Sequence, residues 1–185
     1  MSKFQVITEP LPGLFLIQPK VFSDERGYFF ESYNKKDFSE LGINVDFVQD
    51  NQAKSSYGVI RGLHYQLPPY AQSKLVRVIT GRILDVAVDL RRESPTFGQY
   101  FAIELSDENF LQLFIPKGFA HGYSVLSDEA VVFYKTDEYY HPETEGGLNV
   151  FDPDLSIDWG ISENEAVLSE KDKKQPYLSK AKVFE

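Results

Sequence analysis

Large apolar residues alternate with polar or small ones along several short stretches of the chain, and this pattern predicts β-strands. The alternation is clear from 84 to 90 and again from 101 to 105. Because successive side chains of a strand point to opposite faces, each of these strands is expected to bury one face. The stretches 110–115 and 130–135 are more continuously apolar, which is typical of strands in the core of a β-sandwich.

Short turn-forming sequences separate the predicted strands at close intervals. They are PLPG (10–13), SDERG (23–27), TGR (80–82), SPTFG (94–98), SDEN (106–109), PKG (116–118) and SDE (127–129). Many short strands with regularly spaced turns favour an all-β jelly roll, in which two sheets close around a cavity. A length of 185 residues suits one core, and we expect a single domain over residues 1–185.

Two segments have the features of short peripheral helices. In residues 34–42, Phe38 and Leu41 share one helical face, and Gly42 supplies a left-handed stop. The amphiphilic segment 162–174 is the second predicted helix, with Ser162 as its cap.

Composition and charge narrow the class of protein. Aromatic residues make up 15% of the chain, which favours sheet, and the absence of cysteine excludes disulfides and thiolate metal sites. The formal net charge of -9 opposes binding to nucleic acid or to an anionic membrane surface. The N-terminal residues lack the pattern of a signal peptide and no apolar stretch is long enough to span a membrane, so a cytoplasmic location is expected.

The three histidines of the chain are the natural candidates for chemistry near neutral pH. One of them, His64, lies in the sequence RGLHYQ, and the region around it carries further polar residues that a plain strand does not need: Gln49, Asn51, Arg61, Gln66 and Lys74. If residues 59–66 form a strand, Arg61 should lie on one face and His64 on the other, together with Gln66. His141, by contrast, is predicted to be a surface-turn residue with no role.

A second polar cluster surrounds His121. Pro116, Gly118 and His121 have the P-x-G-x-x-H spacing that resembles the second motif of the cupin superfamily, a family of small jelly-roll barrels. Many cupins bind a transition metal through three histidines and a glutamate, but here the first motif has His64 followed by Gln66, and the expected glutamate is missing from LPPYAQSK. The sequence therefore predicts no metal and no other cofactor, and leaves His64 free to carry protons.

Several longer motifs, taken in order, resemble one cupin family. They are FSDERGYFFESY, QDNQAKSSYGVIRGLHYQ, QSKLVRVITGRILDVAVDLR, SPTFGQY, IPKGFAHGYSVL, FYKTDEYYHPETEGGLNVFDPDLSIDW and LSEKD, and together they span about Thr8 to Tyr177. This order of motifs is similar to the dTDP-4-dehydrorhamnose 3,5-epimerase family. The resemblance implies a cupin-type jelly-roll barrel and a cofactor-independent epimerisation in dTDP-L-rhamnose biosynthesis.

The resemblance also implies catalytic roles. The family reaction removes a proton next to a ketone and returns one from the opposite face, so it needs a base, an acid and a group that stabilises the enolate. By resemblance, His64 is the base, Tyr134 the acid and Lys74 the enolate stabiliser. The roles fit the chemistry, since an imidazole has a pKa of about 6.5 and a phenol of about 10.

The base also needs a carboxylate that fixes its tautomer. The family match gives this role to Asp172. From the residues alone the partner of His64 stays open, because Asp85 and Asp89 also lie on predicted strands.

The substrate implied by the family is a dTDP-4-keto-6-deoxy sugar, and the protein partner is a second copy in a homodimer. Bidentate guanidinium groups suit the pyrophosphate of such a substrate. The residues that match family contacts to the phosphates, sugar or base are Arg26, Glu31, Gln49, Asn51, Arg61, His121, Glu145 and Lys171. Three aromatic residues are candidates for stacking on thymine or closing over the sugar: Tyr28, Phe29 and Tyr140.

Two alternatives remain beside the 3,5-epimerase. One is a related enzyme that epimerises a single carbon or moves the ketone as a ketoisomerase. The other is a sugar-nucleotide-binding cupin without catalysis, which would not need His64, Lys74, Tyr134 and Asp172 together.

Overall fold

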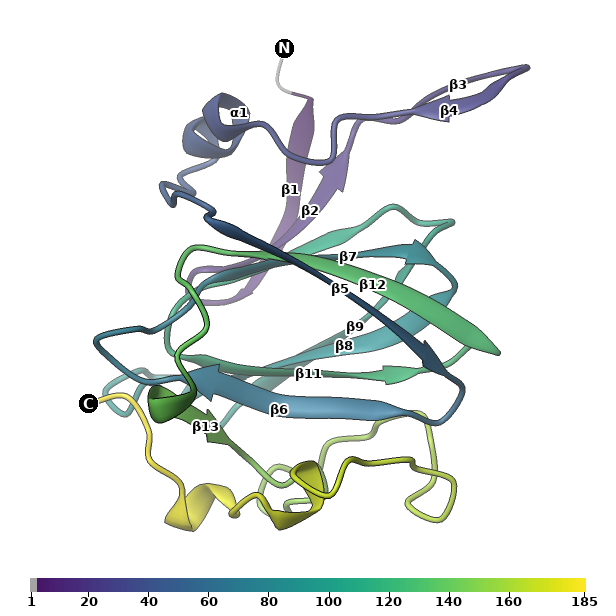
Figure 1. The fold of residues 1–185 in the computed structure, drawn as a ribbon. Helices are drawn as coiled ribbons and strands as arrows, with labels where there is room; N and C mark the ends of the chain where they lie inside the picture. The colour runs from purple at the N-terminus through teal and green to yellow at the C-terminus, as the bar shows by residue number, and fades with distance from the viewer. Residues whose placement is uncertain (1–2) are drawn as a thin grey trace.

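The computed structural model describes residues 3–185 and consists mainly of β-strands in two packed sheets (Figure 1). In spatial order the first sheet contains β1 (Phe4–Leu11), β2 (Leu14–Pro19), β10 (Gln112–Ile115), β7 (Lys74–Thr80), β12 (Glu129–Thr136) and β5 (Gln49–Ser56). The second contains β13 (Glu145–Gly147), β6 (Ile60–Gln66), β11 (Phe119–Val125), β8 (Arg82–Asp89) and β9 (Tyr100–Ser106). Neighbouring strands in both sheets are antiparallel. The prediction of an all-β sandwich is confirmed.

A separate hairpin of β3 (Phe22–Asp24) and β4 (Gly27–Phe29) projects away from the two sheets (Figure 1). Its large apolar side chains are exposed: Phe22 by 46%, Tyr28 by 58% and Phe29 by 65%. An exposed aromatic group of this size is typical of a surface that meets another molecule.

Apolar clusters cover both faces of the second sheet, the inner face of the first sheet and the part of its outer face under α1. The cluster between them contains apolar side chains from each sheet, such as Val76 and Val132 from the first and Ile83 and Leu105 from the second. A second cluster lies on the other face of the second sheet, under the C-terminal segment, and a third lies against α1. The prediction that each alternating strand buries one face is therefore wrong for β8, where Asp85, Ala87 and Asp89 are as buried as the apolar residues between them.

The first predicted helix is confirmed as α1 (Lys35–Glu40). The side chain of Asn34 accepts hydrogen bonds from two backbone amides of the first turn, Phe38 is buried, and Gly42 adopts a φ of +87° after the helix. Among residues 3–185, no helix is long and apolar enough to cross a membrane.

The second predicted helix is wrong. Residues 162–171 form turns, followed by two short 3₁₀ helices, η2 (Asp172–Lys174) and η3 (Leu178–Lys180); a further one, η1 (Pro142–Thr144), precedes β13. The backbone of Val167 is instead hydrogen-bonded to the chain at the start of β6. Its N–H donates to the carbonyl of Gly58, and its carbonyl accepts from the N–H of Ile60. These backbone groups would be occupied within a helix, so tertiary pairing outweighs the amphiphilic pattern.

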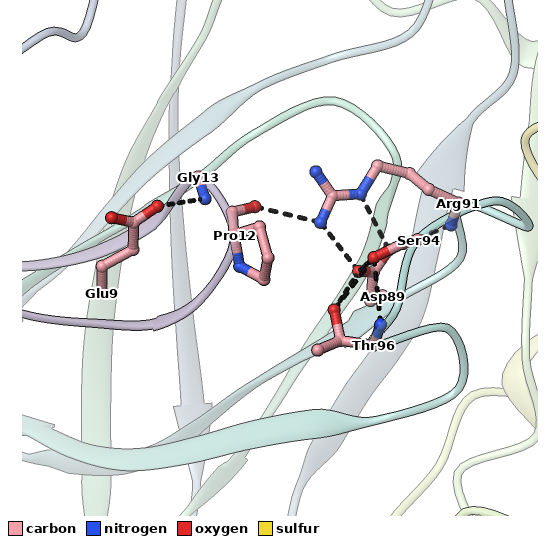
Figure 2. Close-up of polar contacts among 7 residues, drawn as sticks. All are labelled: Glu9, Pro12, Gly13, Asp89, Arg91, Ser94 and Thr96. Carbon is pink, nitrogen blue, oxygen red and sulfur yellow. Dashed lines mark hydrogen bonds and ion pairs between the residues drawn. The ribbon is translucent and has the colours of Figure 1, made fainter.

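A buried carboxylate anchors one end of the barrel (Figure 2). Asp89 accepts hydrogen bonds from the guanidinium of Arg91 and from the hydroxyls of Ser94 and Thr96, and Arg91 also donates to the carbonyl of Pro12 in the β1–β2 turn. Burial would raise the pKa of Asp89, but these hydrogen bonds outweigh it and lower the pKa to about 2. The network thus joins the turn after β8 to the turn between β1 and β2.

We expect Asp89→Asn to lower the free energy of unfolding by about 3 kcal/mol, because it leaves the Arg91 guanidinium without its counter-ion. Since the pKa of Asp89 is depressed, its contribution is present above the unfolded value near 4 and is lost as the pH falls toward 2. Urea unfolding at pH 7 and at acid pH measures both effects. Asp24→Asn is the matched control, since Asp24 pairs with Arg26 at the same spacing on an exposed hairpin. An Asp89→Asn protein as stable as the wild type at pH 7 would contradict the assignment.

Candidate active site

A cavity of about 440 Å³ opens between the two sheets. A second hollow of about 290 Å³ adjoins it and shares His64, Lys74 and Tyr134 with it. Seven of the residues predicted from the sequence line the cavity: Arg61, His64, Lys74, His121, Tyr134, Lys171 and Asp172. Three more line the second hollow: Gln49, Asn51 and Glu145.

An irregularity in β6 places two of these side chains on the same side. Opposite β11, His64 pairs with His121 and Arg61 pairs with Tyr123, so three residue steps on β6 match two on β11. Such a bulge resets the alternation of side chains. The expectation that Arg61 and His64 lie on opposite faces is therefore wrong, and both line the cavity.

Glycine permits the close approach of β6 and β11 at this point. Gly62 has a φ of +127°, and a Cβ atom on it would lie 2.5 Å from the Cα of Gly122. A side chain at Gly122 would in turn meet the carbonyl oxygen of Arg61 at 2.7 Å. Gly62 and Gly122, which face each other across the two strands, thus allow the bulge that directs Arg61 into the site.

His64 pairs with Asp172, as the resemblance implied. Its Nε2 atom lies 2.6 Å from the Asp172 Oδ1 atom, which belongs to η2 near the C-terminus. Burial would raise the pKa of Asp172, but hydrogen bonding to His64 and the charge of that ring lower it, with help from Ser169. With Nε2 directed at the carboxylate, Nδ1 is the ring nitrogen left for a substrate.

The two other candidate carboxylates have different partners. Asp85 lies 2.7 Å from Nε2 of His121, and Asp89 belongs to the anchoring network at the barrel end. The His121–Asp85 pair is buried, and desolvation lowers the pKa of His121 against the opposing effect of Asp85. Two histidines of the cavity are therefore each paired with a carboxylate, and the His64 pair is the more exposed.

Tyr134 enters the cavity from the first sheet, opposite the histidines of the second sheet. It lies on β12, where it pairs with Asn51 on one side and Val76 on the other. Burial raises the pKa of the Tyr134 phenol and the nearby Arg61 opposes this. The phenol is therefore protonated at neutral pH and close to a fixed cation.

Lys74 begins β7 beside His64, and its Nζ atom donates to the His64 carbonyl at 3.4 Å. Desolvation lowers the pKa of Lys74 to about 8, although Asp85 and Glu145 favour its charged form. A cation in a poorly solvated cavity is well placed to interact with an anion that develops there.

Hydrogen bonds and an ion pair hold the residues of the second hollow. Gln49 donates to Asn51 at 3.0 Å, and Glu145 accepts from the Tyr140 hydroxyl at 2.8 Å and pairs with Lys171 at 2.6 Å. Burial would raise the pKa of Glu145, but Lys171 and Tyr140 lower it. This hollow offers amide and charged groups to a polar ligand.

Two predicted binding residues lie outside both hollows. Arg26 is on the exposed hairpin and pairs with Asp24, and Glu31 pairs with Lys3. The hairpin that carries Arg26 points away from the barrel in Figure 1, and neither Arg26 nor Glu31 lines the cavity or the second hollow of its own chain. Tyr28 and Phe29 share this hairpin, whereas Tyr140 lines the second hollow.

Within residues 3–185, no group of three or more histidine, aspartate or glutamate side chains is arranged to hold a metal ion. The expectation of a metal-free site remains a prediction. His141, expected to be a surface-turn residue, stacks on Tyr70 with 3.6 Å between the ring centroids and lies outside both hollows.

Sequence reasoning missed two polar residues of the cavity, Tyr123 and Ser169. Tyr123 lies two positions after His121 on a strand, so period two alone would have placed both on one face. Ser169 lines the cavity and its hydroxyl accepts from the backbone N–H of Asp172 at 3.0 Å, a turn whose position only the fold defines.

Comparisons with known proteins agree with this geometry. A family model described as dTDP-4-dehydrorhamnose 3,5-epimerase matches residues 8–180. A curated relative of that name from Methanothermobacter thermautotrophicus is 49% identical over 185 residues, which is 100% of both chains. The crystal structure of the Elizabethkingia anophelis enzyme of that name is 53% identical with a TM-score of 0.92, and covers 96% of this chain and 97% of that one. A Legionella pneumophila 3,5-epimerase, solved in complex with dTDP-4-keto-L-rhamnose, is 48% identical with a TM-score of 0.92, covering 96% and 94%.

The two-sheet barrel and the relatives it matches identify a cupin-fold epimerase, and the paired His64 and the phenol of Tyr134 in its cavity are consistent with that class. Within that class, the chain belongs to the dTDP-4-dehydrorhamnose 3,5-epimerase family.

Proposed function

We propose that this chain converts dTDP-4-dehydro-6-deoxy-D-glucose to dTDP-4-dehydro-L-rhamnose by inverting C3 and C5, and so acts in dTDP-L-rhamnose biosynthesis. One observation carries the proposal: the His64–Asp172 pair and Tyr134 line a single cavity from different sheets. Inversion of a carbon needs a proton acceptor on one face and a donor on the other, and this arrangement supplies both.

His64 is the base in this mechanism. It removes the proton at the carbon next to the C4 ketone, and the electron pair of the broken C–H bond moves into the enolate. Asp172 holds the ring in one tautomer and stabilises the imidazolium that forms. The Lys74 ammonium stands beside His64 and stabilises the oxygen of the enolate.

Tyr134 is the acid. Its O–H bond breaks as a new C–H bond forms on the opposite face of the sugar, and the phenolate later regains a proton from solvent while the imidazolium loses one. The same two groups act at each carbon in turn, because both carbons flank the same ketone.

The residues around the cavity bind the nucleotide part of the substrate. The guanidinium of Arg61 and the ammonium of Lys171 suit the pyrophosphate. Further contacts in this proposal come from Gln49, Asn51, His121 and Glu145, which line the cavity or the second hollow, and from Arg26 and Glu31, which lie outside the hollows of their own chain. The chain works as one domain in the cytoplasm and needs no metal.

An NMR experiment in deuterated water tests the function. The protein is incubated with dTDP-4-dehydro-6-deoxy-D-glucose and the sugar protons are followed. Deuterium at both C3 and C5, with product of the L configuration, is the expected result, and added chelator should leave the rate unchanged. Exchange at C3 alone would identify a single-carbon epimerase, no exchange would leave a binding protein, and loss of activity to chelator would refute the metal-free mechanism.

A homodimer is part of the proposal. Arg26 and Glu31 match family substrate contacts yet lie outside the cavity of their own chain. Arg26 lies on the hairpin of β3 and β4, and Glu31 follows two residues after its end. The hairpin projects with exposed Phe22, Tyr28 and Phe29, a surface suited to a second copy of this chain (Figure 1). The hairpin of one subunit therefore completes the cavity of the other.

Mixing two impaired variants tests this arrangement. His64→Ala has an intact hairpin and Arg26→Ala has an intact cavity, so mixed dimers contain one complete site. We expect a mixture, after subunit exchange, to exceed the summed activity of the separate variants. Light scattering should give a dimer for the wild type. A monomer that is fully active, or a mixture without any gain, would contradict the shared site.

A further inference from the structure

Gln66 is a buried polar residue of the His64 strand that takes no part in the proposed mechanism. It ends β6, is 3% exposed and lines the second hollow. Its Nε2 atom donates to the carbonyls of Tyr70 at 2.7 Å and Tyr139 at 3.1 Å, and its Oε1 atom accepts from the N–H of His141 at 2.7 Å. Both N–H groups and the oxygen of the amide are therefore occupied by main-chain groups.

Two of these hydrogen bonds bracket Tyr140. The carbonyl of Tyr139 and the N–H of His141 belong to the peptide planes on either side of the Tyr140 Cα atom. Because each peptide plane is rigid, holding both planes fixes the two backbone dihedrals of Tyr140. The N–H of Tyr140 donates in turn to Oε1 of Gln49 at 3.2 Å, which connects it to a predicted binding residue.

Further contacts join the loop between β6 and β7 to the loop that follows β12. Gln72 donates to the carbonyls of Glu138 at 2.8 Å and Tyr139 at 3.3 Å. The rings of Tyr70 and His141 stack with 3.6 Å between their centroids. The buried amide therefore lies where the two loops meet, and the loops together form one supported rim of the second hollow.

The ring of Tyr140 is the aromatic group that this rim offers to the second hollow. It lines the hollow, is 54% exposed, and its hydroxyl donates to Glu145 at 2.8 Å. An exposed aromatic ring on a fixed main chain suits stacking on the planar base of a nucleotide. Fixing such a ring before binding lowers the entropy lost when the ligand arrives.

We propose that Gln66 is a positioning residue for nucleotide binding: its amide fixes the main chain on both sides of Tyr140 and so presents that ring to the base of the bound nucleotide. This role deepens the proposed function and rests on it for the identity of the nucleotide. Gln66 acts through Tyr140, because its own amide is already used by the main chain.

Gln66→Met is the first test, since methionine has a similar length and volume but no amide. We expect the Kd of dTDP, measured by calorimetry, and the KM of the substrate to rise about fivefold to tenfold, with kcat within about twofold, because binding and not proton transfer is impaired. Gln112→Met is the matched control: it makes the same change at a fully buried glutamine of β10 that lies outside both hollows, so dTDP affinity should not change.

A double-mutant cycle distinguishes positioning from a general structural role. Tyr140→Ala alone should weaken dTDP binding about tenfold, which is typical of a lost base stack. Adding Gln66→Met to Tyr140→Ala should weaken binding by less than about twofold more, because the ring that Gln66 positions is gone. If Gln66→Met does not fold, Gln66→Glu serves in the same cycle, since it keeps the oxygen that accepts from His141 and loses both donors.

The outcomes decide the role of Gln66 separately from the reaction. Unchanged dTDP affinity in the Gln66 variant, or a lower kcat at constant KM, would overturn the proposal. An equal loss of affinity with and without the Tyr140 ring would overturn it as well, because Gln66 would then act by another route. Wild-type protein that binds dTDP without epimerising the sugar would refute the epimerase function, whereas the cycle needs no turnover and would still decide whether Gln66 positions Tyr140.

Discussion

His64→Ala should lower kcat by about three orders of magnitude and abolish deuterium exchange at C3 and C5, because it removes the base that accepts the substrate proton. The ring of His64 reaches the cavity, and its pairing with Asp172 leaves one nitrogen free for this task. Exchange is the sharper measurement, since it detects proton removal even when no product forms. The side chain is partly exposed, so the fold should persist with little change in melting temperature.

His141→Ala is the matched control, because His141 lies outside both hollows. It should retain wild-type exchange. Asp172→Asn gives a second, independent check, since the amide can no longer stabilise an imidazolium and should lower kcat without removing the ring. Folded His64→Ala protein that still exchanges substrate protons would remove His64 from the mechanism.

The strands of this protein were predictable because apolar and polar residues alternate along a strand that buries only one face. The same rule failed at β8, where Asp85 and Asp89 sit at buried positions because their side chains find His121 and Arg91 as partners. His121 is 36 positions from Asp85, so no local pattern contains that pairing, whereas Arg91 is only two positions from Asp89 and its role shows only once the turn after β8 is known to be buried. The wrong helix at 162–174 has the same origin, since Val167 is bound by β6 and not by its own segment.

The candidate site, like the fold, was predictable from the sequence only in part. The types of residue needed for proton transfer could be read from the sequence, and resemblance paired His64 with Asp172 across 108 positions. Geometry alone revealed that a bulge brings Arg61 to the same cavity as His64 and that Tyr123 also lines it. A bulge depends on how two strands fit together, so only the Gly62 and Gly122 pair hinted at it.

Lys74→Ala is expected to lower kcat by a factor of about 10² to 10³ with a much smaller change in KM, because Lys74 interacts most strongly with the negative oxygen of the enolate. Its Nζ atom is held beside His64, where the enolate would form. The cavity is poorly solvated, so water cannot replace the missing cation well. Steady-state kinetics measures the effect, and Lys54→Ala, an exposed lysine paired with Glu129, is the control.

The pH profile gives Lys74 a signature that a structural residue would lack. Since desolvation lowers the pKa of Lys74 to about 8, kcat/KM of the wild type should fall as the pH rises through that value and the ammonium is lost. Lys74→Arg keeps a cation that stays charged at alkaline pH, so it should recover part of the activity and move the alkaline fall to higher pH. An alkaline fall that stays in place in Lys74→Arg would mean that another group sets it, and Lys74 would then have no part in stabilising the enolate through its charge.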